Sequence, residues 1–282
     1  MILNSPLEVI MGAGHPFYDK SGQLKSDSNF KYVGGEEVWM ELVNGTAGND
    51  SDGDGINDPW TLIEAREDFQ KLMNGATPKR VIGIPPVANT LQQEREGDTQ
   101  ADPFTVPLIE TVPTLEEMAK ATLNILDNDL DGFFVMIEGG AVDWASHDNQ
   151  FGRMIEEEID FNRTVEAVVN WVEQNSSWDE TIVIVTGDHE TGYLTGLNSG
   201  IQPDGKPIWN PIENRGKGTL PGMEWHSRGH TNSLIPFFAK GAGSELFHQF
   251  ADEIDPIRGK YLDNAEVGKA LLSMFEVIEK AQ

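Results

Sequence analysis

Cysteine is absent from the sequence, which excludes disulfide bonds and thiolate metal ligands. Any transition-metal site must therefore use the nitrogen and oxygen atoms of histidine, aspartate and glutamate. The chain has only six histidines, so each can be followed individually.

Basic residues are scarce. Lysine and arginine number 20 against 47 aspartates and glutamates, which gives a formal net charge of −27 over 282 residues. A surface of this sign repels nucleic acid and anionic membranes, so neither is an expected partner. The charge suits binding of divalent cations or life in salty water, and plain solubility accounts for it equally well.

Long apolar runs are also missing, and none approaches the roughly 20 residues that a membrane helix needs. No lysine or arginine precedes Lys20, so we do not expect a signal peptide, and the amino terminus resembles the interior of a longer protein. A hydrophobic content of 38% and a charged content of 24% are typical of a soluble globular protein.

Short apolar runs alternate with helical patterns. Strands are expected at 9–12, 81–84, 133–137 and 182–185, and an edge strand containing a proline at 234–239. The alternation predicts an α/β fold, a three-layer α/β/α sandwich with a mostly parallel sheet.

Helix starts are recognisable. Thr114 and Glu117 form a capping box that opens a helix towards Leu126, and Asp263 with Glu266 begins a last helix. A valine stripe at i, i+3, i+4 and i+7 predicts an amphipathic helix over 155–172. We interpret 1–282 as a single domain in which 34–102 is an irregular insertion or cap, with one helix near 61–73.

Polar residues gather where two of these strands end. The strand at 133–137 runs into Glu138 and a Gly-Gly pair, and Asp143 and His147 follow, four residues apart. A helical turn would place these last two side chains on one face. Ligands of α/β sheets collect at such carboxyl ends of strands.

The strand at 182–185 likewise ends in Asp188 and His189, and His226 and His230 precede the strand at 234–239. Each piece alone is more typical of a loop hydrogen bond or a solvated helix face. Their repetition at several strand ends favours a metal centre. Nitrogen and oxygen ligands suit zinc, and a position with oxygen ligands alone suits magnesium.

Three motifs resemble the alkaline phosphatase family. They are Glu138-Gly139-Gly140 followed by Asp143 and His147, Thr186-Gly187-Asp188-His189-Glu190-Thr191-Gly192, and Gly229-His230-Thr231-Asn232. Their order matches that family, and the similarity spans most of 110–275. The resemblance is to the carboxy-terminal part of a bacterial-type member with tryptophan, here Trp144, after the zinc aspartate.

The resemblance implies phosphomonoester hydrolysis by a two-metal displacement in which a serine is the nucleophile. Two zinc ions and one magnesium ion are implied. Asp143, His147 and His230 would hold one zinc, Asp188 and His189 would contribute to the second, and Glu138 would bind the magnesium. Trp144 either lines the phosphate pocket or packs beside the metals. His226 is a candidate for supporting the ligands.

The chain departs from the family pattern in one respect. The Asp-Ser-Ala-type nucleophile motif is not recognisable, so the fold is expected to be incomplete on its amino-terminal side and the chain inactive by itself. Ser51 follows Asp50 but sits in an acidic glycine loop, not at a strand-to-helix turn. The catalytic serine is therefore not assigned.

A second metal site is expected in the acidic loop Asp50-Ser51-Asp52-Gly53-Asp54-Gly55-Ile56-Asn57-Asp58. Carboxylates at every second residue wrap oxygen atoms around a hard cation, and the spacing favours calcium over a solvated acidic turn. The ligands would be Asp50, Asp52, Asp54 and Asp58.

Rival functions are another hydrolase with related metal geometry, such as a sulfatase, phosphodiesterase or phosphoglycerate mutase, and a non-catalytic calcium- and zinc-binding fragment. The spacing from Glu138 through Asp143 to His147 favours the phosphomonoesterase. By resemblance, small phosphomonoesters are the expected substrates, the full-length form is a homodimer, and the location is periplasmic or extracellular. His15 and His248 are expected to have structural roles.

Overall fold

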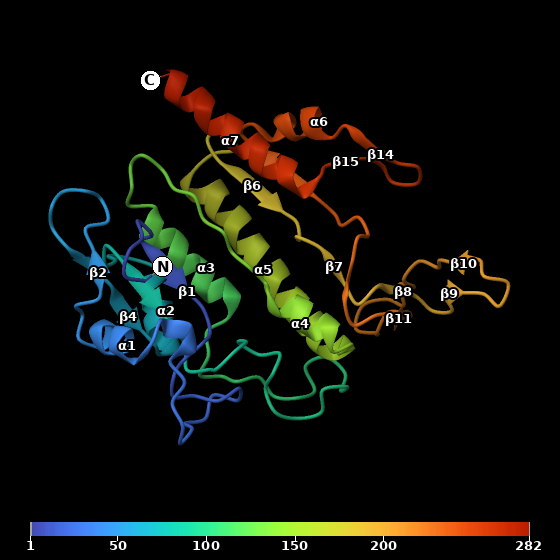
Figure 1. The fold of residues 1–282 in the computed structure, drawn as a ribbon, viewed down its shortest axis with the longest axis horizontal. Coiled ribbons are helices and arrows are strands. Elements are labelled where there is room, and N and C mark those ends of the chain that lie inside the picture. Colours follow the sequence, from blue (N-terminus) through green and yellow to red (C-terminus); the bar gives the residue numbers. More distant parts are fainter. Residues whose placement is uncertain (1, 282) are drawn as a thin grey trace. The chain divides into compact units, whose positions relative to one another are not determined.

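The computed structural model describes residues 2–281, with the side chains of its last helix described as far as Met274. The chain forms two compact units, Met1–Val168 and Val169–Gln282 (Figure 1). Helix α5 (Phe151–Asn175) begins in the first unit and ends in the second. The other elements of the first unit are β1 (Val9–Met11), the 3-10 helix η1 (Lys31–Val33), α1 (Glu36–Val43), β2 (Gly48–Asn49), β3 (Asp58–Pro59), β4 (Thr61–Ile63), α2 (Arg66–Leu72), β5 (Val81–Gly83), α3 (Leu115–Leu126) and α4 (Ala141–His147).

A three-stranded parallel sheet organises the first unit, with β5 between β1 and β4. All three residues of β5 are buried, as expected for an apolar strand covered on both faces. The last residue of this strand is Gly83, and a Cβ at that position would lie 2.5 Å from the ring of Phe69 on α2. The sheet and its covering helix are therefore in close backbone contact.

Helix α3 begins where its capping box predicts. Thr114 Oγ1 accepts a hydrogen bond from the Glu117 backbone N–H at 3.1 Å, and the Glu117 carboxylate accepts one from the Thr114 N–H at 3.0 Å. The helix packs against α2 and β1. Met118, Ala121 and Ile125 of α3 bury their side chains with Phe69 and Val81.

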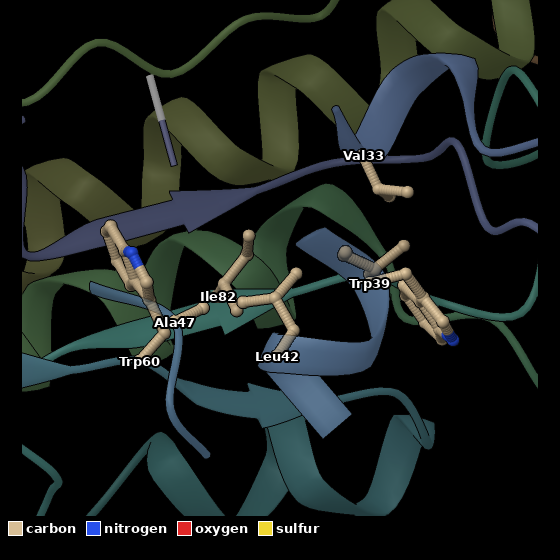
Figure 2. Packing of buried hydrophobic residues seen from close by; sticks show 7 residues of the cluster. Val33, Trp39, Leu42, Ala47, Trp60 and Ile82 are labelled. Carbon is tan, nitrogen blue, oxygen red and sulfur yellow. The ribbon is translucent and has the colours of Figure 1, made fainter. Parts of the chain in front are cut away.

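A second hydrophobic cluster lies around α1 (Figure 2). Trp39 and Leu42 of α1 pack with Trp60 and with Ile82 of β5. The guanidinium carbon of Arg80 lies 3.9 Å from the centroid of the Trp60 ring, and this side chain is also buried. Together the two clusters form the packed core of the first unit.

The second unit is built from short antiparallel pairs. Strand β6 (Ile182–Val185) pairs with β13 (Phe238–Gly241), and β7 (Glu190–Thr191) pairs with β12 (His230–Thr231). The remaining elements are β8 (Leu194–Gly196), β9 (Gly200–Ile201), β10 (Pro207–Ile208), β11 (Met223–Trp225), the 3-10 helix η2 (Ser244–Leu246), α6 (Phe247–Phe250), β14 (Glu253–Asp255), β15 (Gly259–Tyr261) and α7 (Asn264–Ala281).

Most elements expected from the sequence are present. The strands at 9–12, 81–84 and 182–185 and the helices from Thr114, over 155–172 and after Asp263 are all confirmed, within a few residues at their ends. Among the described residues, no helix combines the length and the apolar character needed to cross a bilayer.

Four expectations need correction. The sheet is not mostly parallel, because parallel pairing in the described part of the chain is confined to β1, β5 and β4. The helix near 61–73 is preceded by a strand, since β-branched Thr61 and Ile63 favour extended backbone and the helix starts only at Arg66. The strand at 234–239 is shifted to Phe238–Gly241, beyond Pro236.

The fourth correction concerns 133–137, which forms no strand. A β-strand needs the backbone of a neighbour, and this segment instead borders, together with β1, a cavity of about 730 Å³. Phe134 and Met136 are 69% and 79% exposed, so the apolar run that suggested a buried strand lies open to solvent.

Candidate metal centre

The first group of predicted ligands lies on α4 and the turn before it. Asp143 stands in the first turn of this helix and His147 in the last, and Asp143 Oδ2 lies 3.4 Å from His147 Nε2. The two side chains are 33% and 38% exposed. The prediction that they share one helix face is confirmed.

The Gly-Gly turn before α4 is closely packed. A Cβ on Gly139 would lie 2.9 Å from the ring of Phe161 on α5, and one on Gly140 would lie 3.1 Å from Oε1 of Glu138. Glycine at both positions therefore lets the chain turn against α5 and lets the Glu138 carboxylate fold back towards α4. Glu138 and Trp144 both line the 730 Å³ cavity, and the indole of Trp144 is 44% exposed.

The second group lies where β6 ends in the other unit. Asp188 and His189 follow this strand after Thr186 and Gly187, and Asp188 Oδ2 lies 3.4 Å from His189 Nε2. Because β7 pairs with β12, the ladder brings His230 beside His189, and their rings stack with centroids 3.5 Å apart. The family resemblance assigns these two histidines to different zinc ions.

Neighbouring threonines hold this second group. Thr191 Oγ1 lies 3.2 Å from His189 Nδ1, which orients the ring and turns Nε2 towards Asp188. Thr231 donates a hydrogen bond from its hydroxyl to the Glu190 carboxylate. A hydrogen bond to one ring nitrogen is the usual way in which a metal-binding histidine is held for coordination through the other.

His226 has a different partner. Its Nε2 lies 2.7 Å from the hydroxyl of buried Thr195 on β8, and its ring contacts Tyr193 at 5.8 Å. These contacts join the ends of β8 and β11, which pair antiparallel (Figure 1). The supporting role expected for His226 stays a prediction.

His15, expected to be structural, is buried in the first unit. Its Nε2 lies 2.6 Å from Glu64 Oε1, and its Nδ1 accepts the backbone N–H of Phe17 at 3.2 Å. The rings of Tyr18 and Trp39 pack against it edge-on.

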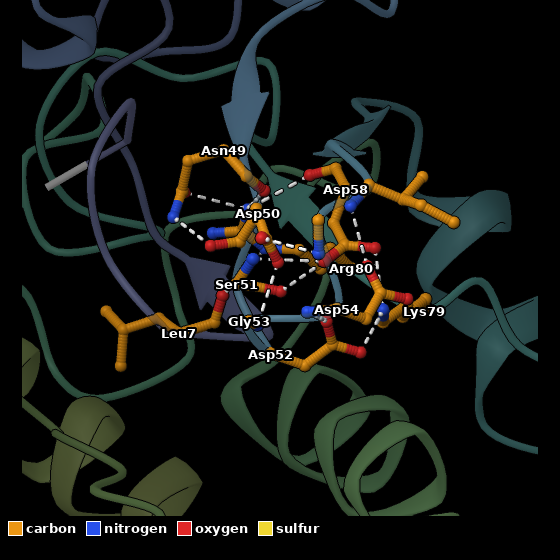
Figure 3. Close-up of polar contacts among 12 residues, drawn as sticks. Leu7, Asn49, Asp50, Ser51, Asp52, Gly53, Asp54, Asp58, Lys79 and Arg80 are labelled. Carbon is orange, nitrogen blue, oxygen red and sulfur yellow. Dashed lines mark hydrogen bonds and ion pairs between the residues drawn. The ribbon is translucent and has the colours of Figure 1, made fainter.

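The acidic loop brings three of its four predicted calcium ligands together (Figure 3). Oxygen atoms of Asp50, Asp52 and Asp58 lie within 4.8 Å of one another, whereas Asp54 is outside this group. Lys79 reaches into the loop, and its Nζ lies 2.7 Å from Asp52 Oδ2 and 2.6 Å from Asp58 Oδ1. The loop is thus already bridged by a cation of the protein itself.

Hydrogen bonds within the loop stabilise its carboxylates in the charged form. Those from Lys79, followed by those from the hydroxyl and the N–H of Ser51, lower the pKa of Asp58 to about 2. The hydrogen bond from Lys79 also lowers the pKa of Asp52 and raises that of Lys79 itself. Sequence reasoning missed Lys79, because it lies 21 residues beyond the loop and follows no spacing rule.

The chain belongs to the alkaline phosphatase family, whose family model matches residues 1–223. Alkaline phosphatase 4 of Bacillus subtilis is 33% identical over 195 residues, which cover 51% of this chain and 42% of the relative. The membrane-bound alkaline phosphatase of Bombyx mori is 26% identical over 218 residues, covering 71% and 36%. The chain spans less than half the length of these curated relatives.

Solved structures show the same fold in part. The cold-active alkaline phosphatase of a psychrophilic Shewanella species matches with a TM-score of 0.52 at 19% identity, covering 85% of this chain and 61% of that one. The Thermus thermophilus enzyme matches with a TM-score of 0.51 at 16% identity, covering 98% and 67%.

Proposed function

We propose that this chain binds the metal ions of a phosphomonoester hydrolase, with small phosphomonoesters as substrates. The predicted ligands are divided between the two units. Asp143 and His147 would bind a first zinc together with His230, Asp188 and His189 would bind a second, and Glu138 would bind magnesium. Imidazole nitrogens and carboxylate oxygens, with no sulfur, suit this assignment.

The observation that carries the proposal is a repeated distance. In each unit a histidine Nε2 lies 3.4 Å from an aspartate oxygen. A direct charge-assisted hydrogen bond would be shorter, about 2.7–2.9 Å. Two ligands of a tetrahedral zinc, each bonded at roughly 2.0–2.2 Å, lie about 3.4 Å apart. Both pairs therefore have the spacing of atoms that share one ion.

Bound divalent cations would neutralise the charge that develops on a transferring phosphoryl group. The protein itself contributes by placing the side chains that would bind these ions. The turn at Gly139 and Gly140 sets Glu138 beside α4, and Thr191 orients the ring of His189. The half-exposed indole of Trp144 offers an apolar wall next to Glu138, suited to the organic part of a substrate.

We assign no serine of this chain as the nucleophile. Ser51 is engaged in the acidic loop, where its hydroxyl and its N–H both donate to Asp58 Oδ2, at 2.8 Å and 3.0 Å. A hydroxyl already donating to a carboxylate there is a structural group. These residues alone are therefore expected to bind metal without hydrolysing phosphomonoesters.

The test measures zinc content and hydrolysis of a chromogenic phosphomonoester at alkaline pH, with zinc and magnesium supplied. Asp143→Ala removes a predicted ligand, and Asp127→Ala, at the exposed end of α3, is the matched control. We expect about two zinc ions in the parent and in the control, fewer in Asp143→Ala, and no turnover in any. Zinc content unaffected by Asp143→Ala would refute the ligand assignment, and metal-dependent turnover would refute the absence of a nucleophile.

We further propose that the acidic loop is a calcium site for which Lys79 competes. Three carboxylates converge there, but the ammonium group of Lys79 contacts two of them (Figure 3). Calcium would have to displace that group before Asp52 and Asp58 could coordinate it.

Calorimetric titration with calcium chloride tests this competition. Lys79→Met should tighten binding by roughly tenfold, because it leaves the carboxylates without their internal cation. Lys71→Met, which breaks an exposed pair with Asp68, should leave calcium affinity as it is in the parent. Equal affinity in parent and Lys79→Met would count against a calcium site.

A further inference from the structure

Helix α4, which presents Asp143 and His147, has little packing of its own. It is seven residues long, and its buried residues are the small Ala145 and Ser146. So short a helix with so little apolar burial does not hold its own position. Its attachment to the rest of the chain therefore contributes to its orientation.

The attachment is the elbow between α4 and α5. The Gln150 N–H donates to the Ala145 carbonyl at 2.9 Å, and the Met154 N–H donates to the Gln150 carbonyl at 2.9 Å, so Gln150 joins both helices. Asn149 between them has a φ of 56°, a left-handed conformation that produces the bend. Moving the Gln150 backbone would therefore move α4.

The side chain of Gln150 is held from a distant part of the chain. Gln93 donates from Nε2 to Gln150 Oε1 at 3.0 Å, and both side chains are buried. Oε1 of Gln93 is buried without a hydrogen-bond partner in the described part of the chain. An unsatisfied buried carbonyl is unfavourable for stability, so the Gln93–Gln150 hydrogen bond is not explained by stability alone.

Gln93 belongs to a segment, 89–107, that crosses the first turns of α5 and is called here the strap. Arg95 of the strap donates to Glu156 of α5, with Nη2 2.8 Å from Oε2, and Glu156 Oε1 accepts the Phe104 N–H at 2.6 Å. Arg153 of α5 completes this buried clamp of Arg95, Glu156 and Arg153, donating to the Arg95 carbonyl at 3.3 Å and lying 3.6 Å from Glu156.

The strap is also in direct contact with the helix backbone. A Cβ on Gly152 would collide with the carbonyl oxygen of Ala101. The side chains of the clamp are 2–5% exposed, so its three charges are removed from water. Buried ion pairs add little net stability over apolar packing but strongly resist displacement, because a partner left unpaired is costly.

We propose that Gln93 and the buried clamp are positioning residues for α4, setting the angle at which Asp143 and His147 approach a metal ion. The inference rests on the proposed function for its metal, but the geometry it describes lies wholly within the first unit. Gln93 acts on the ligands through Gln150 and the elbow, and it touches no metal.

The experiment uses the full chain with Co²⁺ in place of zinc, and Gln93→Met as the variant. Methionine keeps the volume and removes the unsatisfied Gln93 carbonyl, which offsets the Gln150 Oε1 acceptor that it leaves without a donor, so the metal-free protein should unfold at close to the parent temperature. Gln70→Met is the matched control, since Gln70 donates to Glu117 at 2.7 Å on the exposed side of α2. Glu156→Gln weakens the clamp itself as a second variant.

We expect Gln93→Met to weaken Co²⁺ binding by about tenfold and to change its visible absorption spectrum, as loss of a supporting contact behind metal ligands does. Hydrogen exchange of the amides at the end of α4 should accelerate in the metal-free variant and not in Gln70→Met. Parent-like Co²⁺ affinity and spectrum, or parent-like α4 exchange, would overturn the positioning role. If Asp143→Ala binds as much Co²⁺ as the parent, or if the parent binds none, the proposed function fails. The hydrogen-exchange measurement on the metal-free proteins then still decides the positioning role.

Discussion

In the first unit the central strand β5 is sealed from solvent, whereas in the second unit all four residues of β6 are only half-buried. The ligand helix α4 of the first unit is attached to an elbow held by buried hydrogen bonds. In the second unit the predicted ligand His230 stands on β12, and Asp188 and His189 directly precede β7; each of these strands is two residues long. One group of predicted ligands is thus attached to a buried hydrogen-bonded framework, whereas the other is held by short ladders.

The largest expected effect comes from a pair of glycine substitutions, one in each unit. Gly152→Ala places a Cβ against the Ala101 carbonyl and should destabilise the protein by about 3 kcal/mol. Gly268→Ala on α7 meets nothing within 4 Å and should stabilise it by about 1 kcal/mol through helix propensity. Urea denaturation of both variants measures the contrast, and equal effects would show that the first unit is no more tightly packed than the second.

A second prediction concerns pH. Burial, followed by the charge of Asp160, raises the pKa of Glu157 to about 7 from its ordinary 4.5. Oε1 of this residue is buried without a hydrogen-bond partner among the described residues. The folded state therefore favours the protonated form, which contributes stability below about pH 4.5 that is lost as the pH rises through about 7.

Glu157→Gln should remove this pH dependence. At pH 8 the variant should be more stable than the parent by up to about 3 kcal/mol, because it no longer has a buried group to ionise. Chemical denaturation between pH 5 and pH 8 measures the slope, and Glu166→Gln on the exposed face of the same helix should reproduce the parent. A parent-like slope in Glu157→Gln would show that the interior of the first unit admits water.

The smallest effect is expected at the surface of the second unit. Lys240 Nζ lies 3.9 Å from the centroid of the Trp178 ring and 3.8 Å from the Glu173 carboxylate, and its side chain is 62% exposed. Lys240→Met should cost less than about 1 kcal/mol in urea denaturation. Lys206→Met, whose lysine pairs with exposed Asp204, is the control. A larger loss at Lys240 would mean that the second unit relies on this contact more than its exposure suggests.

Local signals in the sequence were sufficient for several features. The capping box at Thr114 fixed the start of α3, and helical periodicity placed Asp143 and His147 on one face, because both depend on residues within a turn of each other. The stacking of His189 on His230 needed the β7–β12 register, which no local pattern contains. This stacking depends on the pairing of two segments that are 41 residues apart in the chain.

Contacts between distant segments could not be predicted. Lys79 bonds to the acidic loop across 21 and 27 positions, and Arg95 bonds to Glu156 across 61 positions. None of these pairs follows a periodicity. The apolar run at 133–137 misled for the opposite reason. Its composition is that of a strand, but strand formation also depends on a neighbouring backbone, which composition does not describe.

Within the described residues one edge of β1 pairs with no other strand, and this has a consequence for handling the protein. This strand is at the border of its sheet and is half-buried, and it faces the same cavity as the exposed segment containing Phe134 and Met136. Open strand edges next to apolar surface are templates for pairing between copies. A net charge of −27 keeps copies apart at low ionic strength, but the screening length shrinks to about 3 Å in 1 M salt. We therefore expect the chain to stay dispersed in dilute salt and to self-associate through β1 in concentrated salt.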